Sequence, residues 1–159
     1  MFKVYKQYEN GGKVLMPKSI DKKGTDYKPL INIANLFAKE GKVVKLTSVI
    51  HFKSEEYKKT YGSLIGTMYE RKCPDLQIDG LFYEFENYIP PFNKKKISHM
   101  IKKGLEQSSR IIINNTKGAA DRFINRLIYN RINNKNINAE IDEVWLYEKG
   151  RLRRLFKKQ

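Results

Sequence analysis

Apolar and polar residues alternate on both sides of Asp79-Gly80, a dipeptide typical of two-residue β-turns. The flanking segments 74–78 and 81–86 therefore predict a β-hairpin. A type I′ turn at this dipeptide fixes the register, because two residues leave one way for the strands to pair. The expected pairs are Ile78 with Leu81, Gln77 with Phe82, Leu76 with Tyr83, and Asp75 with Glu84.

Side chains alternate across the pleat of a strand, so this hairpin has two different faces. The apolar face is expected to face a core and holds Pro74, Leu76, Ile78, Leu81, Tyr83 and Phe85. The opposite face holds Asp75, Gln77, Phe82, Glu84 and Glu86. Like charges across a strand pair repel by roughly 0.2–1 kcal/mol. We therefore expect a cation beside the three carboxylates: a metal ion, a Lys or Arg side chain, or an ion bound with a substrate.

Apolar residues at helical spacing predict helices over 27–40, 94–107 and 118–133, and Ser54-Glu55-Glu56 resembles a further helix start. Strands are expected over residues 2–8, 13–16, 42–50, 111–113, 140–147 and 152–156. The continuous apolar run at 111–113 is typical of a strand covered on both faces. Residues 130–138 are rich in asparagine and predict a loop.

These elements predict an α+β fold. We expect a mixed, mainly antiparallel sheet with a central Asp-Gly hairpin and two or three packing helices. The length of 159 residues suits a single domain. Within it, residues 1–25 would form an N-terminal extension or hairpin, and residues 27–159 the core.

The net charge is strongly positive. Lys and Arg number 32 against 17 Asp and Glu, which gives +15. Such a charge attracts polyanions, with nucleic acid as the first candidate and a membrane surface as the second. A merely soluble basic protein is the alternative.

Other features of the composition narrow the setting. The single cysteine, Cys73, allows no internal disulfide and fits a reducing compartment. Its spacing to His51 and His99 matches no zinc-ligand pattern. We expect no signal peptide in residues 1–12 and no membrane span, and so a protein of the cytoplasm or one delivered into a target cytoplasm.

Two carboxylates of the hairpin could bind a metal ion. Mg²⁺ prefers a few carboxylate oxygens and keeps several waters, and Asp75 with Glu84 could supply two of them. The ion would activate water and neutralise charge that develops on a phosphate. Nearby lysines could assist, the candidates being Lys72, Lys94, Lys95 and Lys102.

Further residues could hold a phosphate. In the segment 118–133, Arg122, Arg126 and Tyr129 follow the spacing i, i+4, i+7. This stripe is either a solvated basic face or a phosphate-contacting one. Ser108, Ser109, Arg110 and His99 complete the set of candidates. Histidine is the usual acid or base near neutral pH, but a structural or exposed role fits His51 and His99 as well.

One family resemblance starts at the hairpin. Pro74-Asp75, followed by Glu84-Phe85-Glu86, resembles the Pro-Asp…(Asp/Glu)-x-Lys signature of the PD-(D/E)XK nucleases. The resemblance implies that Asp75 and Glu84 bind a metal on adjacent strands and that a helix follows. Glu86 stands where that family has lysine, so a lysine from elsewhere would have to substitute.

A second resemblance covers roughly residues 70–157. Four features in order resemble the C-terminal tRNase domains of bacterial contact-dependent growth inhibition toxins. They are the pattern P-D-L-x-I-D-G-x-x-Y-E-x-E, the lysine-rich segment ending at Arg110, the next strand and helix, and the segment 143–150. Those domains are grouped with the barnase–EndoU–colicin–RelE nucleases. The resemblance implies RNA cleavage, often of tRNA, with or without a metal, and an immunity or antitoxin partner. Glu86 again replaces a usual lysine.

Three hypotheses follow for the chain. In the first it is a nuclease, with RNA as the first and DNA as the second substrate candidate, and with Asp75, Glu84, Glu86 and Lys72 as catalytic residues. Substrate would be bound by Lys94, Lys95, His99, Lys102, Ser109, Arg110, Arg122 and Arg126. In the second it binds nucleic acid without cleaving it. In the third the carboxylates only form salt bridges.

Overall fold

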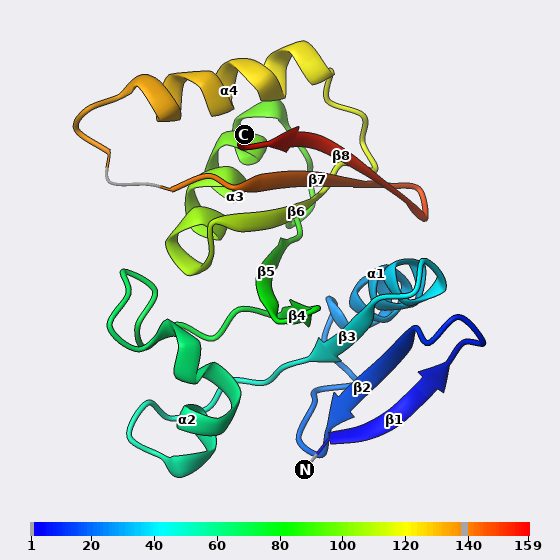
Figure 1. Ribbon diagram of the computed structural model, residues 1–159. Helices are drawn as coiled ribbons and strands as arrows, with labels where there is room; N and C mark the ends of the chain where they lie inside the picture. Colours follow the sequence, from blue (N-terminus) through cyan, green and yellow to red (C-terminus); the bar gives the residue numbers. More distant parts are fainter. Residues whose placement is uncertain (1, 138–139) are drawn as a thin grey trace. The chain divides into compact units, whose positions relative to one another are not determined.

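The computed structural model of the chain describes residues 2–137 and 140–159 and has an α+β fold (Figure 1). The strands are β1 (Phe2–Gln7), β2 (Lys13–Pro17), β3 (Val43–Leu46), β4 (Leu76–Ile78), β5 (Leu81–Glu86), β6 (Arg110–Asn114), β7 (Glu143–Glu148) and β8 (Arg151–Lys157). The α-helices are α1 (Tyr27–Lys39), α2 (Glu55–Tyr61), α3 (Lys94–Gln107) and α4 (Asp121–Asn133). Asn138, the end of the expected loop, lies outside the described residues.

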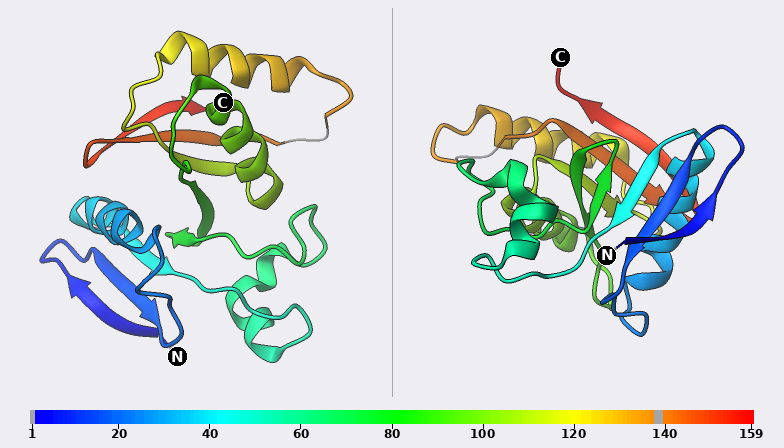
Figure 2. Two further views of the ribbon diagram at one scale, coloured as in Figure 1. Left: turned by 180° about the vertical axis from the view of Figure 1, so that it is seen from behind. Right: turned by 60° about the horizontal axis from the view of Figure 1, so that its bottom comes forward.

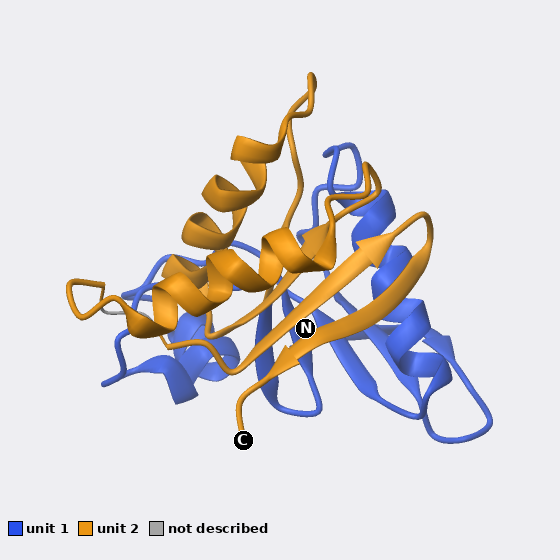
Figure 3. Cartoon of the chain, turned by 90° about the horizontal axis from the view of Figure 1, so that it is seen from above, with its two compact units in different colours: residues 1–83 blue, residues 84–159 orange. Residues whose placement is uncertain are grey.

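The strands pair in chain order. The sheet is mixed, as the sequence predicts. Four pairings are antiparallel, and three are parallel, namely β2 with β3, β5 with β6, and β6 with β7. The described part of the chain has four α-helices instead of two or three. It divides into two compact units, residues 1–83 and 84–159 (Figure 3). Strand β5 contributes to both units: residues 81–83 pair with β4, and residues 84–86 pair with β6.

In the first unit, α1 connects the parallel strands β2 and β3 and packs against both of them (Figure 1). The helix ends before Gly41, whose positive φ of 87° suits the residue after a helix. Gly12, directly before β2, lies so close to α1 that an added Cβ would be 1.7 Å from the carbonyl oxygen of Ala38. Only glycine fits there without a shift of the backbone.

The hairpin β4–β5 belongs to this unit as far as Tyr83. Its Cα pairs are Leu76–Tyr83, Gln77–Phe82 and Ile78–Leu81, the pairs that the Asp-Gly turn predicts. Asp79 and Gly80 have φ values of 47° and 84°, as a type I′ turn requires.

The expected division of the hairpin into an apolar and a polar face is wrong at three positions. Glu84, assigned to the polar face, is 8% exposed. Phe82, assigned to the polar face, is 5% exposed and packs against Tyr61 at a centroid distance of 5.3 Å. Tyr57 extends the same cluster from α2. Leu81, assigned to the core face, is 44% exposed. The short helix α2, distant in sequence, covers the face that local alternation left polar.

In the second unit, α3 and α4 both cover one face of β6 and β7 (Figures 1 and 2). Their apolar residues pack against Ile111 and Ile113 of β6 and Val144 and Leu146 of β7. Ile112, on the opposite face of β6, is also fully buried. The run 111–113 is thus covered on both faces, as its composition predicts.

No helix in the described residues is both long enough and apolar enough for a membrane crossing.

Candidate functional site

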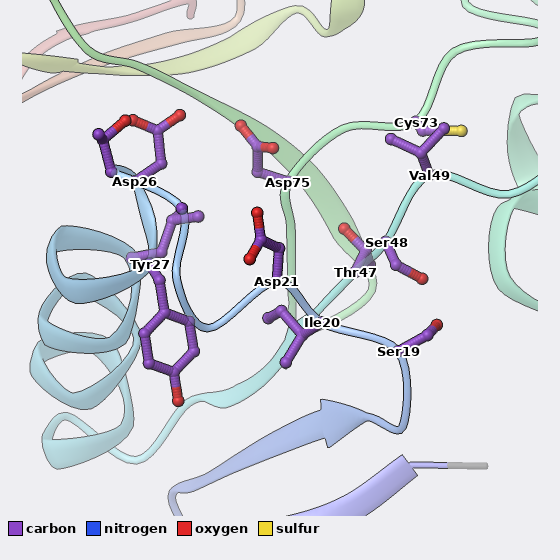
Figure 4. Close-up of a pocket in the computed structure, with 13 residues that line it drawn as sticks. Ser19, Ile20, Asp21, Asp26, Tyr27, Thr47, Ser48, Val49, Cys73 and Asp75 are labelled. Atoms are coloured by element: carbon purple, nitrogen blue, oxygen red, sulfur yellow. The ribbon is translucent and has the colours of Figure 1, made fainter.

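Asp75, the first carboxylate of the proposed site, lines a cavity of about 510 Å³ in the first unit (Figure 4). Two further carboxylates, from Asp21 and Asp26, line the same cavity. The remaining lining residues are Ser19, Ile20, Gly24, Thr25, Tyr27, Leu30, Thr47, Ser48, Val49 and Cys73. A chain of high positive charge therefore has one cavity with three acidic groups and several hydroxyl groups around it.

The position of this cavity follows from the β2–α1–β3 connection. Residues 19–27 follow β2 and begin α1, and residues 47–49 follow β3. Because β2 and β3 are parallel, both loops start at the carboxyl ends of neighbouring strands. This is the usual place for ligands in such units. Asp75 joins them through its backbone carbonyl, which accepts a hydrogen bond from the Thr47 amide at 3.1 Å.

Several hydrogen bonds fix the segments that line the cavity. The Thr47 hydroxyl donates to the carbonyl oxygen of Pro74. The Tyr61 hydroxyl donates to the carbonyl oxygen of Ser48 at 2.7 Å. Asp21 accepts a hydrogen bond from the Lys23 amide at 3.0 Å through one of its oxygens. The carboxylates and hydroxyls of this cavity suit a ligand that donates hydrogen bonds or carries positive charge.

Sequence reasoning missed Asp21 and Asp26. They lie in the polar segment before α1, 54 and 49 residues from Asp75, and no local pattern connects them. Within the described ranges, no group of three or more His, Cys, Asp or Glu side chains is arranged to hold a metal ion.

Lys72, the proposed catalytic lysine, directly precedes Cys73, which lines this cavity. Its backbone carbonyl accepts a hydrogen bond from the Tyr57 hydroxyl at 2.8 Å. Burial, and next the charge of Cys73, raise the pKa of Tyr57 above its ordinary value. This hydrogen bond fixes the backbone of Lys72. A catalytic role for its ammonium group stays a prediction.

Glu84 and Glu86, the other proposed catalytic residues, belong to the second unit. They share one face of β5 and pair with Ile111 and Ile113 of β6. Glu84 is 8% exposed. The Cγ atom of Glu86 lies 3.0 Å from the position of a Cβ added to Gly104 of α3, so Glu86 packs beside this helix. Strand β4 begins at Leu76, one residue after Asp75, and the expected pair of Asp75 with Glu84 stays a prediction.

Ser109 and Arg110 interact with two acidic side chains from the start of β7. The Ser109 hydroxyl donates to Asp142 at 2.6 Å. Arg110 donates through Nε to Glu143 at 3.0 Å and also lies 3.6 Å from Asp142. Glu143 accepts a further hydrogen bond from the Trp145 indole at 3.1 Å. A phosphate would therefore have to compete with Asp142 and Glu143 for Ser109 and Arg110.

The cationic candidates of α3 all lie on its exposed side. They are Lys94, Lys95, His99 and Lys102, joined there by Lys103. The inner side of the helix holds the buried residues Ile97, Met100, Ile101 and Leu105, the stripe that the sequence predicts. Lys96 differs from its neighbours, since its ammonium group donates to the carbonyl oxygens of Ile89 and Pro91.

The candidates of α4 are exposed as well. Arg122, Arg126 and Tyr129 lie on the side opposite the buried Ile124 and Ile128. The structure thus groups Lys94, Lys95, His99 and Lys102 on α3, and Arg122 with Arg126 on α4. Ser109 and Arg110 form a separate network with carboxylates, and Asp75 lines the cavity of the first unit. Comparison of the chain with family models, with curated proteins and with solved structures finds no match.

Proposed function

We propose that this chain binds nucleic acid and cleaves RNA, as an endoribonuclease of the kind that its hairpin region resembles. The observation that carries the proposal is the placement of positive charge. Residues 84–159 hold 17 of the 32 basic residues and eight of the 17 acidic ones, so +9 of the net +15 lies in the second unit. Much of it lies on the exposed sides of α3 and α4. Such surfaces attract a phosphate backbone.

The substrate-binding residues of this proposal are Lys94, Lys95, His99, Lys102, Arg122 and Arg126. Ser109 and Arg110 rank below them, because they donate to Asp142 and Glu143. The proposed catalytic residues are Asp75, Glu84, Glu86 and Lys72. RNA carries its own nucleophile, the 2′-hydroxyl, so cleavage needs a base to take its proton and an acid for the leaving oxygen. Carboxylate and imidazole groups are suitable for both steps.

The first test is an incubation of the purified chain with total RNA, tRNA and plasmid DNA, each with Mg²⁺ and with EDTA. We expect RNA to be degraded under both conditions and DNA to stay intact. Glu84→Gln should slow RNA cleavage by about 100-fold or more, the usual effect of losing an acid or base. Glu55→Gln is the control, since Glu55 is an exposed carboxylate on α2.

Circular dichroism of Glu84→Gln separates loss of chemistry from loss of folding, because Glu84 is buried. Intact RNA in every incubation would reject the cleavage. Undiminished cleavage by folded Glu84→Gln and Asp75→Asn variants would reject the proposed catalytic residues.

A second candidate function is binding of nucleic acid without cleavage. Two observations favour it: Ser109 and Arg110 are engaged by Asp142 and Glu143, and Glu86 stands where both resembled families have lysine. Salt-sensitive RNA binding with no cleavage would support this candidate over the first. Affinity should then fall steeply between low and moderate salt, because each neutralised phosphate releases counterions.

A third candidate is a metal-dependent DNase. Its support is the resemblance of Pro74-Asp75 and Glu84-Phe85-Glu86 to the PD-(D/E)XK signature, in which Asp75 and Glu84 would bind the metal. Plasmid cleavage that needs Mg²⁺ and falls in both Asp75→Asn and Glu84→Gln variants would favour this candidate.

The toxin resemblance also leads us to propose an immunity or antitoxin partner and action in a cytoplasm. A partner that covers the exposed cations of α3 and α4 would be acidic at its contact surface. Its expected effect is to block cleavage at one copy per chain. Addition of the candidate partner to the RNA assay measures that effect directly.

A further inference from the structure

We propose that the outer face of α4 binds single-stranded nucleic acid, with phosphates on Arg122 and Arg126 and a base stacked on Tyr129. This inference rests on the proposed function, because it takes the substrate to be nucleic acid. It goes further in two respects: it names the form of the nucleic acid, and it adds an aromatic residue that recognises that form.

The three side chains share one face of the helix. Residues 122, 126 and 129 are separated by four and three positions, so they follow one another along α4. All three are exposed, and the Tyr129 residue is 66% exposed. The opposite side of α4 packs through Ile124 and Ile128 into the core of its unit. The outer face therefore carries two guanidinium groups and one aromatic ring that the core does not use.

The arginines of this face differ from three other arginines of the second unit. Arg110, Arg153 and Arg154 each form an ion pair with a carboxylate. For Arg122 and Arg126, the described residues supply no hydrogen bond, ion pair or aromatic contact to the side chain. Asp121, the acidic neighbour in sequence, binds Arg153. Arg122 and Arg126 can therefore meet a phosphate without first releasing a carboxylate.

Tyr129 supplies the contact that phosphate binding alone would not need. An exposed tyrosine ring beside cations is a stacking platform for nucleic-acid bases. Bases in a duplex are already stacked on one another, whereas bases of a single strand can turn outward and stack on a side chain. A duplex could reach the two arginines but not the face of the ring. Tyr129 should therefore favour single strands over duplexes.

The start of α4 is fixed to its unit, which gives the face a defined position. Arg153 of β8 binds Asp121 in the first turn of the helix at 2.7 and 2.8 Å. In the loop before α4, Asn115 binds both the amide and the carbonyl of Ala119, at 3.0 and 3.1 Å. A fixed platform loses less entropy when a strand binds.

The test uses a short RNA oligonucleotide with 2′-O-methyl groups, which cannot be cleaved through a 2′-hydroxyl. Fluorescence anisotropy measures its binding as a single strand and as a duplex with its complement. Tyr129→Ala should weaken single-strand binding roughly 5- to 150-fold and leave duplex binding unchanged. Tyr129→Phe should keep single-strand binding, because the ring remains.

Arg126→Gln should weaken binding of both forms and reduce the salt dependence of single-strand binding by about 0.7 in log–log slope, the share of one phosphate. The matched controls are Tyr5→Ala and Arg151→Gln. Tyr5 is a comparably exposed tyrosine with lysine neighbours, 51% exposed, on β1. Arg151 is an exposed arginine of the same unit as Arg126.

Each outcome decides the inference. Equal losses in Tyr129→Ala and Tyr5→Ala, or equal losses for single strand and duplex, would overturn it. Binding of an acidic polypeptide in place of RNA, unaffected by Tyr129→Ala, would also overturn it. RNA cleavage by a chain whose α4 variants bind RNA normally would reject the inference and keep the proposed function. Tyr129-dependent binding in a chain that cleaves nothing would keep the inference and reject the cleavage.

Discussion

The guanidinium group of Arg153 binds both carboxylate oxygens of Asp121, at 2.7 and 2.8 Å, and so ties strand β8 to the first turn of α4. The same guanidinium donates to Glu148 at 2.9 Å, and Glu148 also accepts a hydrogen bond from Asn115 at 2.8 Å. The hydrogen bond from Arg153, together with its charge, lowers the pKa of Asp121, while the two carboxylates raise the pKa of Arg153. One arginine therefore links three elements of the second unit.

Arg153→Gln should lower the free energy of unfolding at pH 7 by roughly 1 kcal/mol, the upper range for exposed ion pairs. Because folding lowers the pKa of Asp121, its contribution is full above the ordinary value of about 3.9 and is lost as pH falls through the folded value. Urea unfolding at neutral and at strongly acidic pH measures the difference between the two proteins. Arg151→Gln, which removes an exposed arginine of the same strand, should have little effect. A loss that is the same at both pH values would contradict the ionic origin.

The features that could be read from the sequence are those set by neighbours in the chain. Asp79-Gly80 fixes three residue pairs between β4 and β5, because the turn itself determines the register. The buried residues of α3 follow from helical spacing alone. Strand β3 is shorter than expected, Val43–Leu46 in place of 42–50, because β4 offers only three pairing partners.

The features that could not be read depend on residues far apart in sequence. Phe82 is buried because Tyr57 and Tyr61 of α2 cover it, and alternation within β5 carries no trace of them. The cavity at Asp75 gains Asp21 and Asp26 only through the β2–α1–β3 connection. Arginine is a residue type that commonly binds phosphate, but Arg110 donates to Glu143, which is 33 residues away in the sequence. A sequence shows which residue types could bind or react, whereas the partners of each side chain are known only once the fold is known.

Gly12→Ala should destabilise the first unit severely. The new Cβ would lie 1.7 Å from the backbone oxygen of Ala38, a distance that either β2 or α1 must move to relieve. We expect a loss of about 3 kcal/mol or more, or failure to fold. Gly62→Ala is the matched control, since its Cβ meets nothing within 4 Å and its φ of −56° suits alanine. Thermal unfolding of the two variants makes the comparison, and equal melting temperatures would contradict the close packing at Gly12.

Gly104→Ala tests the position of Glu86, one of the proposed catalytic residues. The added Cβ would lie 2.9 Å from Cγ2 of the buried Ile111 and 3.0 Å from Cγ of Glu86. Alanine favours the helix by up to about 1 kcal/mol, but the crowding should cost about 1–3 kcal/mol, so a net loss is expected. The control Lys103→Ala changes an exposed position of the same helix and should be nearly neutral.

A double-mutant cycle assigns part of that loss to Glu86. In a Glu86→Ala background the Cγ atom is absent, so Gly104→Ala should cost measurably less than in the parent chain. Urea unfolding of the four proteins gives the coupling energy. A coupling of zero would place Glu86 away from α3, and the proposed site would then have to be drawn without that contact.

Tyr57→Phe should make unfolding less sensitive to alkaline pH. The Tyr57 hydroxyl donates to the Lys72 carbonyl at 2.8 Å inside a buried aromatic cluster, and burial raises its pKa. A group with a raised folded pKa contributes stability that is full below its ordinary value, about 10, and is lost as pH rises through the folded value. The variant should lose about 1 kcal/mol at pH 7, where the hydrogen bond is gone, and should lose less than the parent chain between neutral and strongly alkaline pH. Urea unfolding over that range measures both effects, and Tyr5→Phe, at an exposed tyrosine, supplies the control. Identical pH dependence of Tyr57→Phe and the parent chain would show that the Tyr57 hydroxyl ionises as freely in the folded protein as in the unfolded one.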